Sequence, residues 1–365
     1  MNYQRHLFFI LGIVIFFSIN CQAVYASDWH QLIRNSPYRF SQNFHFNLSQ
    51  IRQWVLFQQG FCSIQSRHIL FNRRGEFLSY LDNAEDSLQT QSKLNLVREK
   101  LFKANRVTRY VEGSEDSLGF PFALNCDQPH ADVFEAMDRL FGKDKKDRLW
   151  GTWDGLKAGT KKQPVPLNQL VELVYKAKSE IIEQAVVGTE LRHFLAQIII
   201  ESGARKHGLS KANAIGLLQL KPEVLKDCQI PERFYRHRMA QVDCAVRLFQ
   251  QNRRNLEAAF KERFGNLPKK KRETLFSLLL TQSYHSGVGR MIRLLNDPQV
   301  GKASQHFANN HSNYSAADIA SGIIFHNLGR EELGFASLYY VVDIAIVAEK
   351  LCESKNLRNS WICAD

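Results

Sequence analysis

The chain has 365 residues, of which 44% are apolar and 23% are charged, and its formal net charge at pH 7 is +12. This composition excludes a disordered or fibrous protein and predicts a globular one, of one or two domains, with a substantial core. The basic charge favours polyanionic partners in general but does not select one of them.

The first 26 residues predict a secretory signal peptide. Arg5 and His6 precede the apolar run Leu7–Ile19, and Ala26 ends a permissive cleavage site. The run is shorter than the roughly 20 residues that a membrane span needs. An uncleaved N-terminal anchor is the alternative. We expect an exported, periplasmic chain that has no stable membrane span after leader removal and meets no nucleic acid.

Apart from Cys21 in the leader, the cysteines are Cys62, Cys126, Cys228, Cys244, Cys352 and Cys363. An even number in an exported chain predicts disulfides. Proximity in sequence favours pairing Cys228 with Cys244 and Cys352 with Cys363, which leaves Cys62 with Cys126. A zinc site is the competing interpretation, but the chain has no Cys-x-x-Cys spacing. We therefore predict neither a metal nor a cofactor.

Residues 27–150 predict a smaller region of mixed or α+β structure. Ser63–Leu81 has the pattern of a hairpin that turns at Asn72–Gly75, and helical spacing of apolar residues predicts helices at Ser87–Ala104 and Asp132–Phe141. No motif in this region carries chemistry. Its role is left open, and contact with other cell-envelope proteins is one interpretation.

Residues 151–165 are predicted to be a linker because glycine and proline punctuate them. The chain then becomes helical, and we predict an all-helical domain over residues 166–365. Its first helix covers Leu170 to Ala185 and is expected to end at Gly188, and Thr189 is expected to cap the next. Further helices are predicted at Glu273–Gln282, Gly289–Leu295, Ala316–Asn327 and Phe335–Cys352.

Glu201 is the residue most suited to chemistry, because it ends a strongly apolar helix that contains Ile198–Ile200. Partial burial disfavours the charged form of a carboxyl group, which can then hold and donate a proton near neutral pH. A glutamate at an exposed helix end is the alternative that the position alone would favour.

Four ordered motifs carry a resemblance to a known family. They are Glu201-Ser202, Gly216-Leu217-Leu218-Gln219-Leu220-x-Pro222, Ser283-Tyr284-His285-Ser286-Gly287, and Tyr340-Val341. Over roughly residues 166–351 the chain resembles the soluble lytic transglycosylases, which are related to goose-type lysozyme. Leu218 stands where the family has Met, His285 where it has Asn, and Gln241 where Asn is more usual.

The resemblance implies a mainly α protein with a lysozyme-like C-terminal catalytic domain that acts on the glycan strands of peptidoglycan. It implies cleavage of the MurNAc-β-1,4-GlcNAc bond with formation of 1,6-anhydro-MurNAc ends, and Glu201 would be the general acid and base. The substrate-binding residues that it implies are Ser202, Gly216, Leu217, Gln219, Tyr284, His285 and Tyr340. A tyrosine on an apolar helix is otherwise most often a core residue.

Two alternatives remain open from the sequence. A hydrolytic lysozyme of the same fold would place water where the C6 hydroxyl attacks and would use a second carboxylate, which the sequence does not identify. A non-catalytic peptidoglycan-binding or scaffold protein would keep the groove without turnover, and His285 in the third motif keeps this interpretation open.

Overall fold

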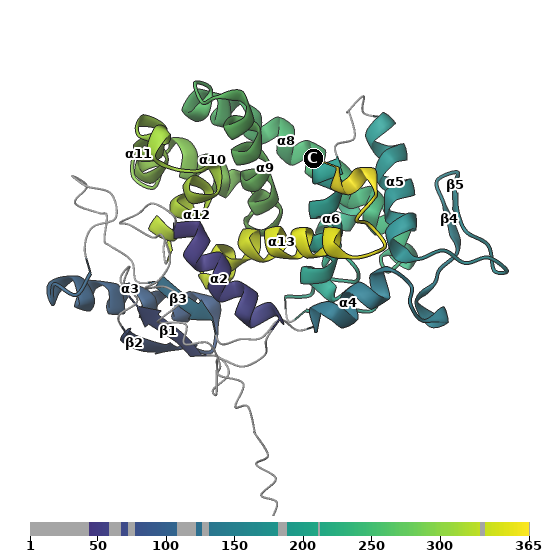
Figure 1. The fold of residues 1–365 in the computed structure, drawn as a ribbon, viewed down its shortest axis with the longest axis horizontal. Coiled ribbons are helices and arrows are strands. Elements are labelled where there is room, and N and C mark those ends of the chain that lie inside the picture. Colours follow the sequence, from purple (N-terminus) through teal and green to yellow (C-terminus); the bar gives the residue numbers. More distant parts are fainter. Residues whose placement is uncertain are drawn as a thin grey trace, which may run out of the picture.

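The computed structural model describes residues 44–57, 67–71, 77–107, 122–125, 131–181, 188–210, 212–328 and 333–364 (Figure 1). The predicted signal peptide, the hairpin turn at 72–75, Cys62 and Cys126 lie outside these residues. The described chain is mainly helical, as predicted. Among its helices, none is long and apolar enough to cross a membrane.

From residue 166 onward, the described regular structure consists of helices. They are α5 (Leu167–Ile181), α6 (Gly188–Ser202), α7 (Pro222–Asp227), α8 (Arg238–Phe264), α9 (Lys269–Ser286), α10 (Val288–Asn296), α11 (Lys302–Asn309), α12 (Ala316–His326) and α13 (Phe335–Glu353), with short 3-10 turns between some of them. The helices predicted from apolar spacing within this stretch are confirmed where the structure describes them, and residues 182–185 of the first predicted helix lie outside the described residues. Gly188 and Thr189 are corrections. Helix α6 begins at Gly188, so Gly188 does not end the preceding helix and Thr189 lies inside α6 rather than capping it.

Helix α13 lies at the centre of the fold and contacts α6, α9, α12 and α2 (Figure 1). Its residues Val342, Val347 and Leu351 are at most 1% exposed, because apolar side chains occur all around this helix. On α6, Leu191, Leu195, Ile198 and Ile199 are buried in the same core, and Ile200 is partly buried against it. The two helices therefore bring the end of α6, which carries Glu201, next to the first turns of α13.

The elements that precede residue 150 contain both helices and strands. They are α2 (Phe44–Phe57), β1 (Arg67–Phe71), β2 (Phe77–Asp82), α3 (Ser87–Lys103), β3 (Phe122–Asn125) and α4 (Val133–Leu140). The strands form an antiparallel sheet in the order β2-β1-β3. The predicted hairpin and the two predicted helices are confirmed. Asp86 and Asp132 cap α3 and α4 by accepting backbone N–H bonds.

Helix α2 packs against α12 and α13 rather than standing apart from the helical part of the chain (Figure 1). Arg52 of α2 donates two hydrogen bonds of 2.7 Å to the carboxylate of Asp343 on α13. Both side chains are at least nine-tenths buried. The guanidinium also lies 4.5 Å from the ring centre of Tyr339. This contact anchors α2 on the central helix.

The interval 151–165, predicted as a linker, contains an antiparallel hairpin of β4 (Gly151–Trp153) and β5 (Leu156–Ala158). Trp153 attaches the hairpin to α8 by donating a 2.9 Å hydrogen bond from Nε1 to Asp243. The ring of Trp153 also packs edge-on against Phe234 at 5.4 Å. The division of the chain into domains stays a prediction.

Two of the three predicted cysteine pairs fall in the described residues, and both are confirmed. Cys228 is paired with Cys244, with 5.5 Å between the Cα atoms, and Cys352 with Cys363, with 5.6 Å. The first pair ties α7 to α8, and the second ties the end of α13 to the C-terminal turn. Each closes a short loop, which limits the freedom of the unfolded chain.

Candidate active site

Glu201 lies in the last turn of α6 and accepts a hydrogen bond from the hydroxyl of Tyr340 on α13. The distance from Tyr340 Oη to Glu201 Oε1 is 2.6 Å. Tyr340 is only 5% exposed, whereas Glu201 is half-buried. The carboxyl group therefore keeps access to solvent or to a ligand while one of its oxygens is held by a buried donor.

The protein around Glu201 raises the pKa of its carboxyl group to about 7, because loss of hydration disfavours the charged form. The hydrogen bond from Tyr340 acts in the opposite direction and limits the rise. A pKa near neutrality lets one group hold a proton in part of a reaction cycle and release it in another. Glu201 therefore has the electrostatic character of a general acid and base.

Tyr340 stays protonated, because burial and the neighbouring Glu201 raise the pKa of its phenol well above 10. Its hydroxyl also accepts a 3.3 Å hydrogen bond from Nε2 of Gln197, which lies one turn before Glu201 on α6. The imidazole of His285 is stacked on the tyrosine ring, with 4.4 Å between centroids and 20° between planes. Tyr340 is thus fixed on three sides as a donor to Glu201.

His285 is exposed, and its stacking partner Tyr340 is the residue that contacts Glu201. Loss of hydration around the ring, one face of which is covered by Tyr340, and the nearby charge of Arg290 lower the pKa of the imidazole to about 4. The ring is therefore neutral near pH 7 and presents a polar face without a charge.

The segment that follows α6 returns close to its end through a loop at residues 216–219, which begins and ends with a residue of positive φ, Gly216 at +72° and Gln219 at +47°. A Cβ atom at Gly216 would lie 2.2 Å from Nε2 of Gln241. The Gln241 amide donates to the carbonyl of Ile215 and accepts from the N–H of Leu218. Glycine is therefore required at position 216 so that α8 can hold the loop.

Two hydroxyl groups bind the same loop from other helices. Ser202 donates from Oγ to the carbonyl of Leu217 at 2.7 Å, and Tyr284 donates from Oη to the carbonyl of Leu218 at 2.7 Å. Gln219 folds back, and its Nε2 donates to the carbonyl of Gly216 at 2.8 Å. These three side chains bind the backbone of the loop.

The predicted residues thus lie close together, but some contact Glu201 or its partner and others contact the loop. Tyr340 contacts Glu201 directly, and His285 contacts Tyr340. Ser202 and Tyr284 hold the loop. The side chain of Leu217 is fully buried in the core, so its backbone rather than its side chain faces a polar partner. Substrate binding by these residues stays a prediction.

Sequence reasoning missed Gln197 as part of the site and noted Gln241 only as a departure from the family. Gln197 lies in an otherwise apolar stretch of α6, four residues before Glu201, and this spacing places both on one helix face. A polar residue at that spacing from a candidate acid is the signal that could have identified it.

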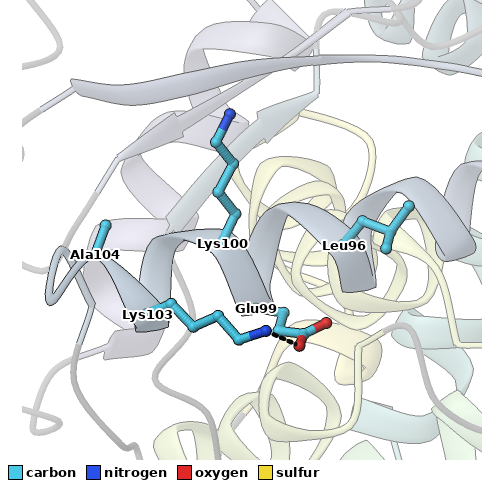
Figure 2. Close-up of a pocket in the computed structure, with 5 residues that line it drawn as sticks. All are labelled: Leu96, Glu99, Lys100, Lys103 and Ala104. Atoms are coloured by element: carbon cyan, nitrogen blue, oxygen red, sulfur yellow. Dashed lines mark ion pairs between the residues drawn. The ribbon is translucent and has the colours of Figure 1, made fainter.

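A surface hollow of about 420 Å³ lies elsewhere, on α3, and is lined by Leu96, Glu99, Lys100, Lys103 and Ala104 (Figure 2). Glu99 and Lys103 form an exposed ion pair of 2.6 Å, and Lys100 points away from them (Figure 2). The hollow is open to solvent and contains none of the predicted site residues. It is best described as a solvated helix face.

The described residues contain no group of three or more His, Cys, Asp or Glu side chains placed to bind a metal ion. Comparison with known proteins finds no matching family model, and no curated protein matches the chain.

Proposed function

We propose that this chain is a peptidoglycan lytic transglycosylase whose single acid and base is Glu201. The observation that carries the proposal is the carboxyl group of Glu201, held by the neutral donor Tyr340 and with its pKa raised to about 7. The four ordered motifs supply the substrate class. In this proposal residues 166–365 form the lysozyme-like catalytic domain, and the region before them contributes to placement in the cell envelope.

In the first half of the reaction, protonated Glu201 donates its proton to the glycosidic oxygen that leaves MurNAc. The N-acetyl group of MurNAc stabilises the positive charge that develops at C1. In the second half, ionised Glu201 accepts the proton of the C6 hydroxyl, and the C6 oxygen bonds to C1. The product carries a 1,6-anhydro end, and Glu201 is again protonated. A pKa near the working pH serves both halves.

The neutral partners of Glu201 suit a mechanism that needs one carboxylate. Among the described residues, the electrostatic partners of Glu201 are Tyr340 and Tyr284, which are both neutral. A retaining or inverting hydrolase places a second carboxylate within about 5–10 Å of the first. A mechanism in which the substrate supplies the stabilising group needs only one carboxylate.

The remaining predicted residues have roles that fit this reaction. The loop at Gly216 to Gln219, fixed by Ser202, Tyr284 and Gln241, forms a preorganised edge beside Glu201. The neutral imidazole of His285 provides a hydrogen-bonding face for a sugar. No cofactor takes part. The two disulfide pairs suit an oxidising compartment and therefore an exported, periplasmic enzyme.

The test is mass spectrometry of the soluble products after the purified protein is incubated with isolated peptidoglycan. Wild type is expected to release anhydro-ended muropeptides, and Glu201→Gln is expected to bind peptidoglycan but release none. Glu99→Gln is a matched control, because it removes an exposed carboxylate on α3 and should leave product formation unchanged.

Each other outcome selects an alternative. Products with reducing ends would identify a hydrolytic lysozyme. Sedimentation of wild type and Glu201→Gln with peptidoglycan, without release by either, would identify a binding or scaffold protein and refute the proposal.

A further inference from the structure

Two hydrogen bonds in series connect Gln197 and Glu201, both on α6, through the hydroxyl of Tyr340 on α13. Nε2 of Gln197 donates to the hydroxyl oxygen of Tyr340 at 3.3 Å, and that hydroxyl donates to Glu201 Oε1 at 2.6 Å. Gln197 is 0% exposed. It therefore does not reach substrate, and any effect it has on Glu201 passes through Tyr340.

Donor and acceptor roles run one way along the series, from Gln197 to Tyr340 to Glu201. The amide nitrogen of glutamine only donates, and a phenol has one proton. When Gln197 occupies an acceptor position of the Tyr340 oxygen, the proton of Tyr340 remains for Glu201. A hydroxyl that donates to a carboxyl group stabilises its ionised form more than its protonated form.

The amide of Gln197 is costly for the fold. Its Oε1 is buried and has no hydrogen-bond partner among the described residues. A buried carbonyl without a partner destabilises the folded state, whereas an apolar side chain of the same shape would not. An apolar residue at position 197 would therefore serve stability at least as well, and what distinguishes Gln197 is its hydrogen bond to Tyr340.

We propose that Gln197 is a positioning residue, which orients the Tyr340 hydroxyl toward Glu201 and thereby favours the ionised form of Glu201 that acts as the base. Its bearing on turnover rests on the proposed transglycosylase activity. Its effect on the protonation of Glu201 does not, and the two can be tested separately.

The other charged or titratable groups near this series do not supply the same effect. From α9, Tyr284 binds the carbonyl of Leu218, and His285 is neutral near pH 7. From α4, Arg139 donates to the carbonyl of Gly203. From α13, Asp343 is paired with Arg52 on the side of α2. The neutral Tyr340 is the group whose hydrogen bond moves the pKa of Glu201.

The experiment compares wild type with Gln197→Met, which keeps the length of the side chain and removes both polar atoms. The pKa of Glu201 is measured from the 13Cδ chemical shift of labelled glutamate, and the signal is assigned by its absence in Glu201→Gln. We expect the pKa to rise by about 0.5. The melting temperature should be unchanged or higher, because the unpaired carbonyl is removed.

Gln282→Met is the matched control. Gln282 is also 0% exposed and also has an unpaired Oε1 in the described structure, but its amide bonds Ser286 and not Tyr340. Its replacement should leave the titration of Glu201 unchanged.

A second cycle tests whether the effect passes through the tyrosine. Tyr340→Phe should raise the pKa of Glu201 by about 1, and adding Gln197→Met to it should cause no further change. The proposal is overturned if Gln197→Met leaves the pKa unchanged, if it acts equally in the Tyr340→Phe background, or if it lowers the melting temperature as a purely structural residue would.

The activity readout is kept separate from the titration. If wild type forms anhydro-ended products, the alkaline limb of kcat/KM should move to higher pH in Gln197→Met by the same amount as the pKa. If wild type forms none, the proposed function fails, while the 13C titration still decides whether Gln197 acts on Glu201.

Discussion

Two carboxyl groups beside α13 differ in what faces them. Asp343 lies between α13 and α2, where the guanidinium of Arg52 binds both of its oxygens at 2.7 Å. Glu201 lies where α6 meets α13, and its hydrogen-bond donor is the neutral hydroxyl of Tyr340. Loss of hydration raises the pKa of both carboxyl groups. The cation Arg52 limits the rise at Asp343, and the neutral hydroxyl of Tyr340 limits it at Glu201.

The difference separates a carboxylate that holds the fold together from one that is free to exchange a proton. A bidentate ion pair fixes geometry and charge together, so both oxygens of Asp343 are taken up by Arg52. Glu201 keeps its position through Tyr340 but receives no compensating charge. Tyr340, which binds Glu201, and Asp343, which binds Arg52, lie within one turn of each other on α13.

The largest effect is expected where the ion pair is broken. Arg52→Met leaves Asp343 buried without its cation and should lower the free energy of unfolding by about 3–5 kcal/mol. Chemical denaturation at pH 7 measures this change. The double variant Arg52→Met/Asp343→Leu should recover most of the loss, because an apolar pair needs no compensation. An equal loss in both variants would mean that the contact matters through packing alone.

The second prediction concerns the carboxyl group without a cation. The pKa of Glu201 is raised in the folded state, from 4.5 to about 7, so its contribution to stability is complete below 4.5 and is lost as the pH rises through 7. Glu201→Gln removes that dependence. The variant should gain stability relative to wild type on going from pH 4.5 to pH 8, by at most about 3 kcal/mol.

Denaturation curves of wild type and Glu201→Gln at the two pH values measure this difference. Glu99→Gln is the control. The carboxylate of Glu99 is exposed and paired with Lys103, so this variant should not gain stability relative to wild type at alkaline pH. A stability difference that is the same at pH 4.5 and pH 8 would contradict the raised pKa.

Much of the helical fold was predictable from the sequence, because apolar periodicity marks each amphipathic helix. The 27-residue helix α8 was missed, because residues such as Gln241, Asp243, Gln250 and Asn252 are polar and yet buried. Periodicity cannot detect a buried face made of polar side chains that bond one another or the backbone. Gly188 begins α6 instead of ending the preceding helix, because a glycine at a helix boundary can belong to either side.

The candidate site was predictable in its residues but not in its contacts. Motif spacing indicates Glu201 and Tyr340 as site residues, and the packing of α6 on α13 brings their oxygens to 2.6 Å. Motif spacing does not reveal that Tyr284 and Gln219 bind the loop backbone, since such bonds depend on the positive φ of Gly216 and Gln219. Hydrogen bonds across elements far apart in sequence require the tertiary structure.

The third prediction tests whether the loop beside Glu201 is held by its close contact with α8. Gly216→Ala introduces a methyl group 2.2 Å from Gln241 Nε2 at a φ of +72°, and should cost about 2 kcal/mol of stability as well as lower kcat/KM. Gly155→Ala is the control, because φ there is +77° but nothing lies within 4 Å of the added Cβ. It should show the backbone strain alone. Equal losses of stability and activity in the two variants would mean that the contact with Gln241 is unimportant.

The smallest effect is expected at His285, which lies in the same region as Glu201 but is neutral. With its pKa lowered to about 4, the imidazole should not titrate in a proton NMR spectrum between pH 8 and about 5. His285→Asn loses the stacking contact with Tyr340, which should cost less than about 1 kcal/mol of stability. The pKa of Glu201 should not change, because a neutral ring contributes no charge to it. A fall in the pKa of Glu201 on substitution would mean that the ring had excluded water from Glu201. A rise would mean that His285 carries a positive charge and compensates a carboxylate, as Arg52 does at Asp343.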